Sequence, residues 1–313
     1  MNLRLDSENG DLETCLWSRI RVTGPDARDY LHRMTTAQVK HLRPGQITSG
    51  CFLTAQGKVR AAFSLACTEA NTFTLELDAG RDEAWKKALL EVIEQFHFAE
   101  AFETVDASSS GLSWFFLTES PEGAQASRFE SFGNLEIYHH DSGTWGRPWI
   151  SVWGPRSERD AWAKTLGTEF RSAKFSELQA GRIQALAPWA DQEVVADANP
   201  LEIGLRAAIA DNKGCYPGQE VIEKIVALGS PARRLVLLQG APAASAPAPA
   251  PGAPVQDSAS GTELGRITSV APLGGSGAGW VALAVLRKTH ARPGQAVHVA
   301  GSEVAVQAVA AYE

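Results

Sequence analysis

Apolar and polar residues alternate along several short segments of the chain, which is the pattern of half-buried β-strands. Turn signals bound these segments, as at Thr23-Gly24-Pro25 and at Gln56-Gly57. In the first two thirds of the chain the alternation predicts strands over 16–22, 50–53, 58–66, 112–117, 135–139 and 149–152.

Other segments show the 3.6-residue spacing of amphipathic helices. A helix is predicted after Pro25, where Tyr30, Leu31 and Met34 share one face, and further helices are predicted over 82–96 and 219–228. Another follows Gly154-Pro155, so that the strand–Gly-Pro–helix arrangement occurs twice. This repetition points to two related α+β subdomains.

The composition changes abruptly after the apolar run at 235–238. Residues 241–254 are almost only Ala, Pro, Ser and Gly, which predicts an extended, mobile loop. Short apolar strands then alternate with glycine turns, the pattern of a small antiparallel barrel. Because one apolar run precedes the loop, the loop is expected inside the barrel domain. We therefore predict an α+β region over 1–234 and a β-barrel domain over 235–313.

Charge and hydropathy restrict the kind of protein. The chain of 313 residues has 29 Lys and Arg against 36 Asp and Glu, a net charge of −7, which argues against a surface for direct nucleic-acid binding. The longest apolar runs have strand length and are too short to span a membrane. Residues 1–10 lack the apolar core of a signal peptide. We expect a cytoplasmic protein that binds no membrane.

The four cysteines, Cys15, Cys51, Cys67 and Cys215, show neither C-x-x-C spacing nor a histidine at a zinc-ligand interval. No metal site is predicted, and free thiols are expected. His139 and His140 are adjacent on a predicted strand, point to opposite faces and are not expected to share an ion.

Two further segments, one polar and one glycine-rich, have plain explanations. Asp191 and Glu193 lie beside Trp189 in a predicted loop and are expected to be solvated. The glycine-rich run 274–279 lies between barrel strands, lacks the lysine of a phosphate loop and is predicted to be a hairpin.

Cys215 lies in the most informative segment, Lys213-Gly214-Cys215-Tyr216-Pro217-Gly218-Gln219-Glu220. Turn signals flank the cysteine and a helix follows. The charge of Lys213 and the start of the helix both favour a thiolate, which makes Cys215 a candidate reactive thiol. A cysteine in a glycine-bounded loop also occurs as a small packing residue, and that alternative stays open.

This segment resembles the K-G-C-Y-x-G-Q-E signature of the YgfZ/GcvT-like folate-binding family at every defined position. Segments 22–39, 51–59, 182–188, 199–205 and 265–269 are also similar to family segments. The family is related in fold to the glycine-cleavage aminomethyltransferase. The resemblance implies an α+β fold of two subdomains plus a C-terminal antiparallel β-barrel, arranged as a ring around a folate-sized hole.

The resemblance also implies a function. Family members bind tetrahydrofolate and support the assembly, repair or activity of iron–sulfur enzymes, including enzymes that modify tRNA. Folate and iron–sulfur client or assembly proteins would then be the partners. Cys215 would be the functional thiol, with Lys213 beside it in the catalytic role. The implied cofactor contacts are Trp17, Gln184, Glu202, Tyr216, Gly218, Gln219, Glu220 and Arg234.

Two of these contacts have plainer alternatives. Trp17 lies on an amphipathic strand, so it also fits a core packing role. Arg234 follows Arg233 at the start of an apolar run, where a solvated pair is expected.

The chain departs from the aminomethyltransferase at positions that carry chemistry. In the enzyme the hairpin after the glycine turn carries adjacent aspartates, whereas here Arg60-Ala61 supply no carboxylate. Gln184 stands where the enzyme has a glutamate, and the enzyme normally has no cysteine at position 215. We therefore expect folate binding without methylene transfer, although enzyme activity is left open. The alternatives are one-carbon transfer to tetrahydrofolate and a non-catalytic interaction scaffold.

Overall fold

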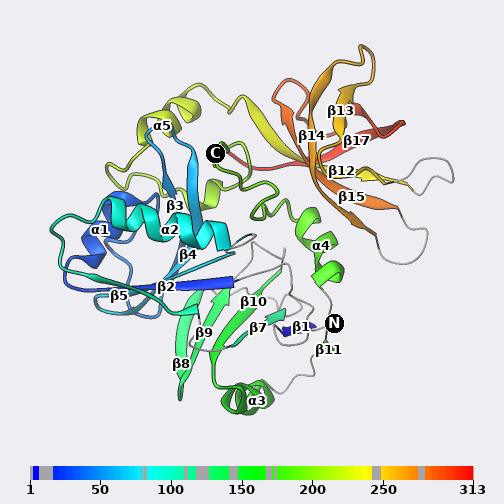
Figure 1. Cartoon of the computed structure of the whole chain (residues 1–313). Helices are drawn as coiled ribbons and strands as arrows, with labels where there is room; N and C mark the ends of the chain where they lie inside the picture. Colours follow the sequence, from blue (N-terminus) through cyan, green and yellow to red (C-terminus); the bar gives the residue numbers. More distant parts are fainter. Residues whose placement is uncertain are drawn as a thin grey trace. The chain divides into compact units, whose positions relative to one another are not determined.

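The computed structural model resolves the chain into two compact units, described separately below (Figure 1). The first unit takes the described residues within Met1–Gly143, Arg147–Phe175 and Ala207–Gln219. The second takes those within Ser176–Arg206 and Glu220–Glu313. The ring arrangement concerns the placement of these units and stays a prediction. The structure describes residues 3–6, 17–78, 80, 83–108, 112–117, 127–140, 147–166, 171–172, 175–241, 248–273 and 279–312.

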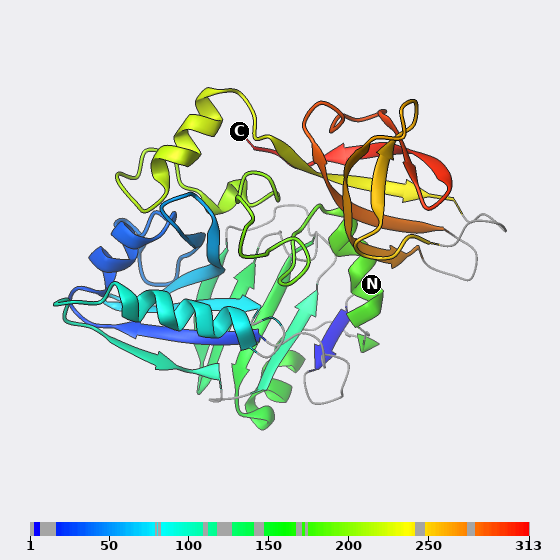
Figure 2. The ribbon, with the colours of Figure 1, turned by 45° about the horizontal axis from the view of Figure 1, so that its top comes forward.

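The first sheet of unit 1 is antiparallel throughout. Its strands, in order, are β3 (Ile47–Leu53), β4 (Val59–Glu69), β5 (Thr72–Asp78), β2 (Trp17–Thr23) and β6 (Glu103–Asp106). Two helices, α1 (Ala27–Met34) and α2 (Ala84–Gln95), pack on this sheet, α2 against β4 and β5 (Figure 2). The helix predicted over 82–96 is thereby confirmed. Strand β5 was not among the predicted strands, although polar and apolar residues alternate along Thr72–Asp78, and five consecutive residues of it are buried.

The second sheet of unit 1 contains the later α+β elements. Its order is β11 (Arg171–Ser172), β1 (Leu3–Asp6), β7 (Leu112–Leu117), β10 (Trp149–Gly154), β9 (Leu135–His140) and β8 (Arg128–Phe132). All pairs are antiparallel except β1 with β11. Helix α3 (Arg156–Thr165) packs Trp162 against Ile150 and Val152 of β10. The strands predicted at 112–117, 135–139 and 149–152 are confirmed.

The two Gly-Pro steps are alike in structure as well as in sequence. Gly24 follows strand β2 and has a φ of +154°. Gly154 ends strand β10 and has a φ of +133°. A Cβ atom at either glycine would lie within 3 Å of the neighbouring backbone. In both cases a carboxylate in the next turn accepts a neighbouring backbone N–H, Asp26 from Ala101 (2.7 Å) and Glu158 from Asn134 (2.8 Å).

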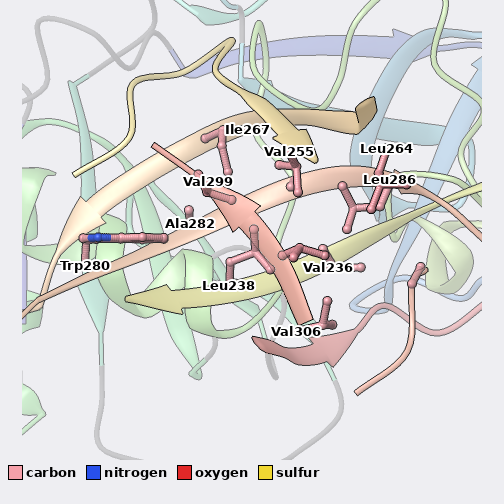
Figure 3. Close-up of a cluster of buried hydrophobic side chains, with 13 residues drawn as sticks. Val236, Leu238, Val255, Leu264, Ile267, Trp280, Ala282, Leu286, Val299 and Val306 are labelled. Atoms are coloured by element: carbon pink, nitrogen blue, oxygen red, sulfur yellow. The ribbon is translucent and has the colours of Figure 1, made fainter. Parts of the chain in front are cut away.

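Unit 2 contains a closed barrel, which confirms the predicted C-terminal architecture. Its strands close in the order β12 (Arg233–Gly240), β15 (Trp280–Arg287), β14 (Glu263–Pro272), β13 (Pro254–Asp257), β16 (Ala296–Val299) and β17 (Ser302–Val309). Every neighbouring pair is antiparallel. The side chains of Val236, Leu238, Ile267, Trp280 and Val306 meet inside the barrel (Figure 3).

The prediction of an extended, mobile loop over 241–254 is wrong for the end of that segment. Pro249 is buried, and the Gly252 N–H donates to the carbonyl oxygen of Ile267 at 2.8 Å. Pro254 begins strand β13. Such a segment lacks core side chains, but its backbone groups still pair with a neighbouring strand. Residues 242–247, and 274–278 of the glycine-rich run, lie outside the described part of the chain.

Three short helices lie outside the sheets, namely α4 (Phe175–Gln184), the 3-10 helix η4 (Arg206–Ala208) and α5 (Gln219–Ala227). Helix α5 was predicted over 219–228, yet Ile222 is its buried apolar residue and Val226 is exposed. Among the helices of the described ranges, none has the length and apolar composition needed to cross a bilayer.

Candidate functional site

The chain leading to the cysteine segment is fixed at Thr36, a fully buried residue of unit 1. The Thr36 hydroxyl donates to the carbonyl oxygen of Ala208 at 2.5 Å and accepts the Cys51 N–H at 2.8 Å. The N–H of Ala210 donates to the Thr36 carbonyl at 3.0 Å. Residues 208–210 are therefore held beside the start of the first hairpin.

Lys213 is the next fixed point of this segment. The residue is 6% exposed, and its ammonium donates to the carbonyl oxygens of Thr35 (2.8 Å) and His32. Both carbonyls lie at the carboxyl end of α1, where backbone acceptors lack partners within the helix. The ammonium also lies 4.9 Å from the ring centroid of Tyr216. Burial lowers the pKa of Lys213 to about 8, and the charge of Cys215 opposes that lowering.

Gly218 is the third fixed point, and only a glycine suits it. Its φ is +83°, and a Cβ atom would lie 2.6 Å from the Thr54 carbonyl oxygen and 3.0 Å from Gly57 Cα. Both neighbours belong to the turn between β3 and β4, where the Thr54 carbonyl accepts the Gly57 N–H at 2.9 Å. The signature segment therefore packs directly on this hairpin turn.

Cys215 lies between Lys213 and Gly218 and is exposed. The other cysteines that the structure describes, Cys51 and Cys67, are buried, and Cys15 lies outside the described residues. Burial raises the pKa of Cys51 to about 12, although the hydrogen bond with Thr36 opposes the rise. The thiol that the sequence singled out is thus on a surface loop, whereas Cys51 and Cys67 are packing residues.

Trp17 is half-buried at the start of β2 and takes part in an aromatic cluster of unit 1. Its ring centroid lies 5.5 Å from that of Trp149, with a tilt of 50°. Trp149 in turn stacks on His140 at 3.8 Å. The structure therefore places Trp17 in side-chain packing, and its stacking on folate stays a prediction.

The predicted cofactor residues divide between the two units. Trp17, Tyr216, Gly218 and Gln219 belong to unit 1, and Gln219 donates its N–H to the Tyr216 carbonyl at 3.2 Å. In unit 2, Gln184 and Glu220 are exposed and Glu202 is half-buried.

Arg234 is a structural residue of unit 2. Its guanidinium donates to the carbonyl oxygen of Ala310 at 2.8 Å and lies 4.4 Å from the ring centroid of Tyr312. The interpretation of Arg233 and Arg234 as a solvated pair is therefore wrong for Arg234, because the returning chain supplies a carbonyl and an aromatic ring.

The interpretation of Glu193 as solvated is also wrong. Glu193 is 1% exposed, and its carboxylate lies 3.1 Å from the fully buried guanidinium of Arg182. Arg182 also donates to Ser269 of β14 at 2.8 Å, and Glu193 accepts the Trp189 N–H at 3.0 Å. Asp191, by contrast, is exposed. Arg182 and Ser269 lie in segments that resemble the family, whereas Glu193 lies between such segments, and the pairing was not readable from the sequence.

A second buried carboxylate, Glu76 of β5, was missed for the same reason. It accepts hydrogen bonds from the hydroxyl of Ser151 (3.0 Å) and the indole N–H of Trp153 (2.6 Å), both on β10. His140 Nε2 lies 3.5 Å from the same carboxylate. These contacts join the two sheets of unit 1 through a polar network.

The two adjacent histidines contact different groups, as alternation along a strand requires. His140 faces Glu76, whereas His139 contacts Glu130 at 2.8 Å. Within the part of the chain that the structure describes, no group of three His, Cys, Asp or Glu side chains is arranged to hold a metal ion.

The start of β4 carries no carboxylate at Arg60 and Ala61, the positions where adjacent aspartates are expected in the aminomethyltransferase. The Arg60 guanidinium donates to the side-chain oxygen of Gln95 at 2.7 Å, so it is occupied by helix α2. Ala61 is fully buried. Neither residue can act as an acid or base on a substrate nitrogen at neutral pH.

Comparisons with known proteins place these features in context. The chain matches no protein-family model. It is 26% identical over 306 residues to the putative transferase At1g60990, chloroplastic, of Arabidopsis thaliana, covering 90% of this chain and 66% of that protein. It is 27% identical over 241 residues to the tRNA-modifying protein YgfZ of Edwardsiella ictaluri (strain 93-146), covering 72% and 69%. The chain thus spans about two thirds of the length of these curated relatives.

The fold is shared with a solved enzyme structure. The glycine cleavage system aminomethyltransferase T of Bartonella henselae superimposes with a TM-score of 0.77, over 98% of this chain and 85% of that one. Sequence identity is 17%, a level at which the likeness speaks for the fold alone. The two curated relatives, this common fold and the closed C-terminal barrel agree with one another, and the chain is similar to proteins of the YgfZ/GcvT-like family.

Proposed function

We propose that the protein is a tetrahydrofolate-binding accessory factor that supports the assembly, repair or activity of iron–sulfur enzymes, including tRNA-modifying ones. In this proposal Cys215 is the functional thiol, and folate and iron–sulfur client or assembly proteins are the partners. The observation that carries the proposal is the exposure of Cys215 on a loop that is fixed at both ends, by Lys213 and by Gly218. A relative named as a tRNA-modifying protein supports the same assignment.

The residues proposed for the cofactor suit a pterin by their chemistry. The amino-pyrimidine edge of a pterin carries N–H donors, which a carboxylate such as Glu202 accepts, and its flat ring stacks on an aromatic side chain such as Trp17. Gln184, Tyr216, Gln219 and Glu220 would add further polar groups. Glu202 is half-buried and Gln184 and Glu220 are exposed, so these three side chains are open to solvent.

Cys51, Cys67 and Cys215 are all free thiols, which suits a reducing compartment, and we propose the cytoplasm.

One-carbon transfer is the second candidate function, because one relative is named a putative transferase and the fold is that of an aminomethyltransferase. Against this candidate, Arg60 and Ala61 offer no carboxylate at the start of β4. The transferase predicts release of the aminomethyl group from a carrier protein when tetrahydrofolate is added. The accessory factor predicts no such turnover.

Calorimetric titration with tetrahydrofolate tests the cofactor half of the proposal. We expect saturable binding that weakens by up to about tenfold in Trp17→Ala, because stacking on an aromatic ring is worth about 0.5–1.5 kcal/mol. Phe98→Ala, which removes an aromatic side chain that is 83% exposed, is the matched control and should bind like the wild type. Absence of saturable heat in the wild type would favour an interaction scaffold.

Complementation tests the thiol half. In cells that lack the protein, Cys215→Ala should fail to restore the activity of iron–sulfur enzymes, including a tRNA-modifying one. Cys67→Ala removes a buried thiol and should restore that activity as long as the variant accumulates. Full restoration by Cys215→Ala would reject a functional thiol while leaving folate binding untouched.

A further inference from the structure

We infer that Lys213 is a positioning residue: it ties the thiol loop to the carboxyl end of α1 and acts on the thiol by setting where the loop holds it. The inference rests on the proposed function only in taking Cys215 as the functional group. It reassigns a lysine that the sequence placed beside the cysteine as a catalytic partner.

The surroundings of the ammonium carry the inference. Lys213 Nζ donates to the Thr35 and His32 carbonyl oxygens and faces the ring of Tyr216. An ammonium has three N–H donors. Two carbonyl oxygens and one aromatic face therefore provide one partner for each of these donors. With the residue 6% exposed, protein groups rather than solvent surround the charge.

The acceptors explain why the residue is a lysine. The last carbonyls of a helix are free acceptors and carry the negative end of the helix dipole, which a cation stabilises. Helix α1 ends at Met34, and its final turn offers these oxygens to a residue 178 positions away in the sequence. A neutral or shorter side chain would leave the two carbonyls without this donor.

Between the two fixed points, the loop is open to solvent at Gly214 and Cys215. A Cβ atom on Gly214 would meet no atom within 4 Å, and Cys215 is exposed. Gly218 packs on the hairpin turn three residues beyond the thiol. The position of the sulfur therefore depends on Lys213 on one side and Gly218 on the other.

Hydrogen exchange of the full-length protein, read by mass spectrometry, tests the inference together with alkylation of Cys215 by iodoacetamide. In Lys213→Met we expect peptides covering 211–217 to exchange about tenfold faster, since the variant loses two hydrogen bonds from a charged donor. The alkylation rate of Cys215 should change in the same variant, and Lys213→Arg should retain most of the wild-type protection from hydrogen exchange. Lys40→Met is the matched control: Lys40 is an exposed lysine that also lowers the pKa of His32, and its loss should leave both rates unchanged.

Each outcome decides something. Unchanged exchange in Lys213→Met would overturn the positioning role, and so would equal effects of Lys213→Met and Lys40→Met, because charge alone would then be responsible. If Lys213→Met fails to fold, the comparison of Lys213→Arg with the wild type still reports on the contact. Positioning would be rejected if Lys213→Arg exchanged like the wild type while Cys215 was alkylated at half the wild-type rate. Loss of the proposed function would appear differently, as full complementation by Cys215→Ala with the exchange results unaltered.

Discussion

The guanidinium of Arg182 and the carboxylate of Glu193 form an ion pair with no exposed side-chain surface, at 3.1 Å. Thr268 and Ser269 of β14 also donate to the carboxylate, and Arg182 further donates to the Ala187 carbonyl at 2.7 Å. A buried ion pair of this kind connects helix α4 and the loop after it to the barrel within unit 2. The hydrogen bonds and the opposite charge compensate the desolvation of both groups, since either charge alone would be costly to bury.

We therefore predict that Glu193→Gln destabilises the protein by about 3–5 kcal/mol, because it leaves the buried Arg182 charge without compensation. Denaturant unfolding would measure the loss. The control is Glu263→Gln, which breaks an exposed ion pair with Arg266 and should cost less than about 1 kcal/mol. Equal effects of the two substitutions would contradict a special role for burial, and the double variant Arg182→Met/Glu193→Leu should cost less than Glu193→Gln alone.

Gly218→Ala is predicted to displace the thiol loop. The added Cβ would lie 2.6 Å from the Thr54 carbonyl oxygen, in addition to the cost of a positive φ for alanine. Gly214→Ala has the matching φ of +93° without any atom within 4 Å and isolates the conformational cost, about 1–2 kcal/mol. Thermal unfolding should show a distinctly larger loss for Gly218→Ala than for Gly214→Ala. Similar losses would mean that the contact with the hairpin turn contributes nothing.

The titration of Lys213 predicts a rise of stability with pH. Its pKa is about 8 in the folded protein against 10.5 in the unfolded chain, so between these values the unfolded state binds more protons. The free energy of unfolding should therefore increase from pH 8 to pH 10.5 by up to about 3 kcal/mol from this group. The measurement is the difference between wild type and Lys213→Met at each pH, which cancels other groups. A difference that stays flat or falls would show that the ammonium is not buried as described.

Cysteine labelling should follow the burial of the thiols. In the native protein iodoacetamide should modify Cys215 at once and spare Cys51, because burial shields Cys51 and raises its pKa to about 12. Burial raises the pKa of Cys67 as well. Peptide mapping would assign the label, with protein in denaturant as the reference in which every cysteine reacts. Native labelling of Cys51 at the rate of Cys215 would contradict the packing around Thr36.

Local pattern predicted a good part of the fold. The helix at 82–96 and the barrel strand at 296–299 have clear periodicity, because one face of each is buried and the other is not. Strand β5 and the short strand β13 escaped prediction. Strand β5 alternates polar and apolar residues, and this pattern was not recognised, whereas β13 begins inside a Pro/Ala-rich segment whose pairing depends on β14.

The sequence by itself determined that a cysteine lies between two turn signals ahead of a helix, since glycine, proline and helical spacing act over a few residues. Only the tertiary structure decided what holds that loop, because Lys213 reaches Thr35 across 178 positions and Gly218 needs the shape of a distant hairpin turn. The same holds for Arg182 and Ser269, 87 positions apart. Hydrogen bonds of this range are selected by packing, and packing couples residues that no local pattern relates.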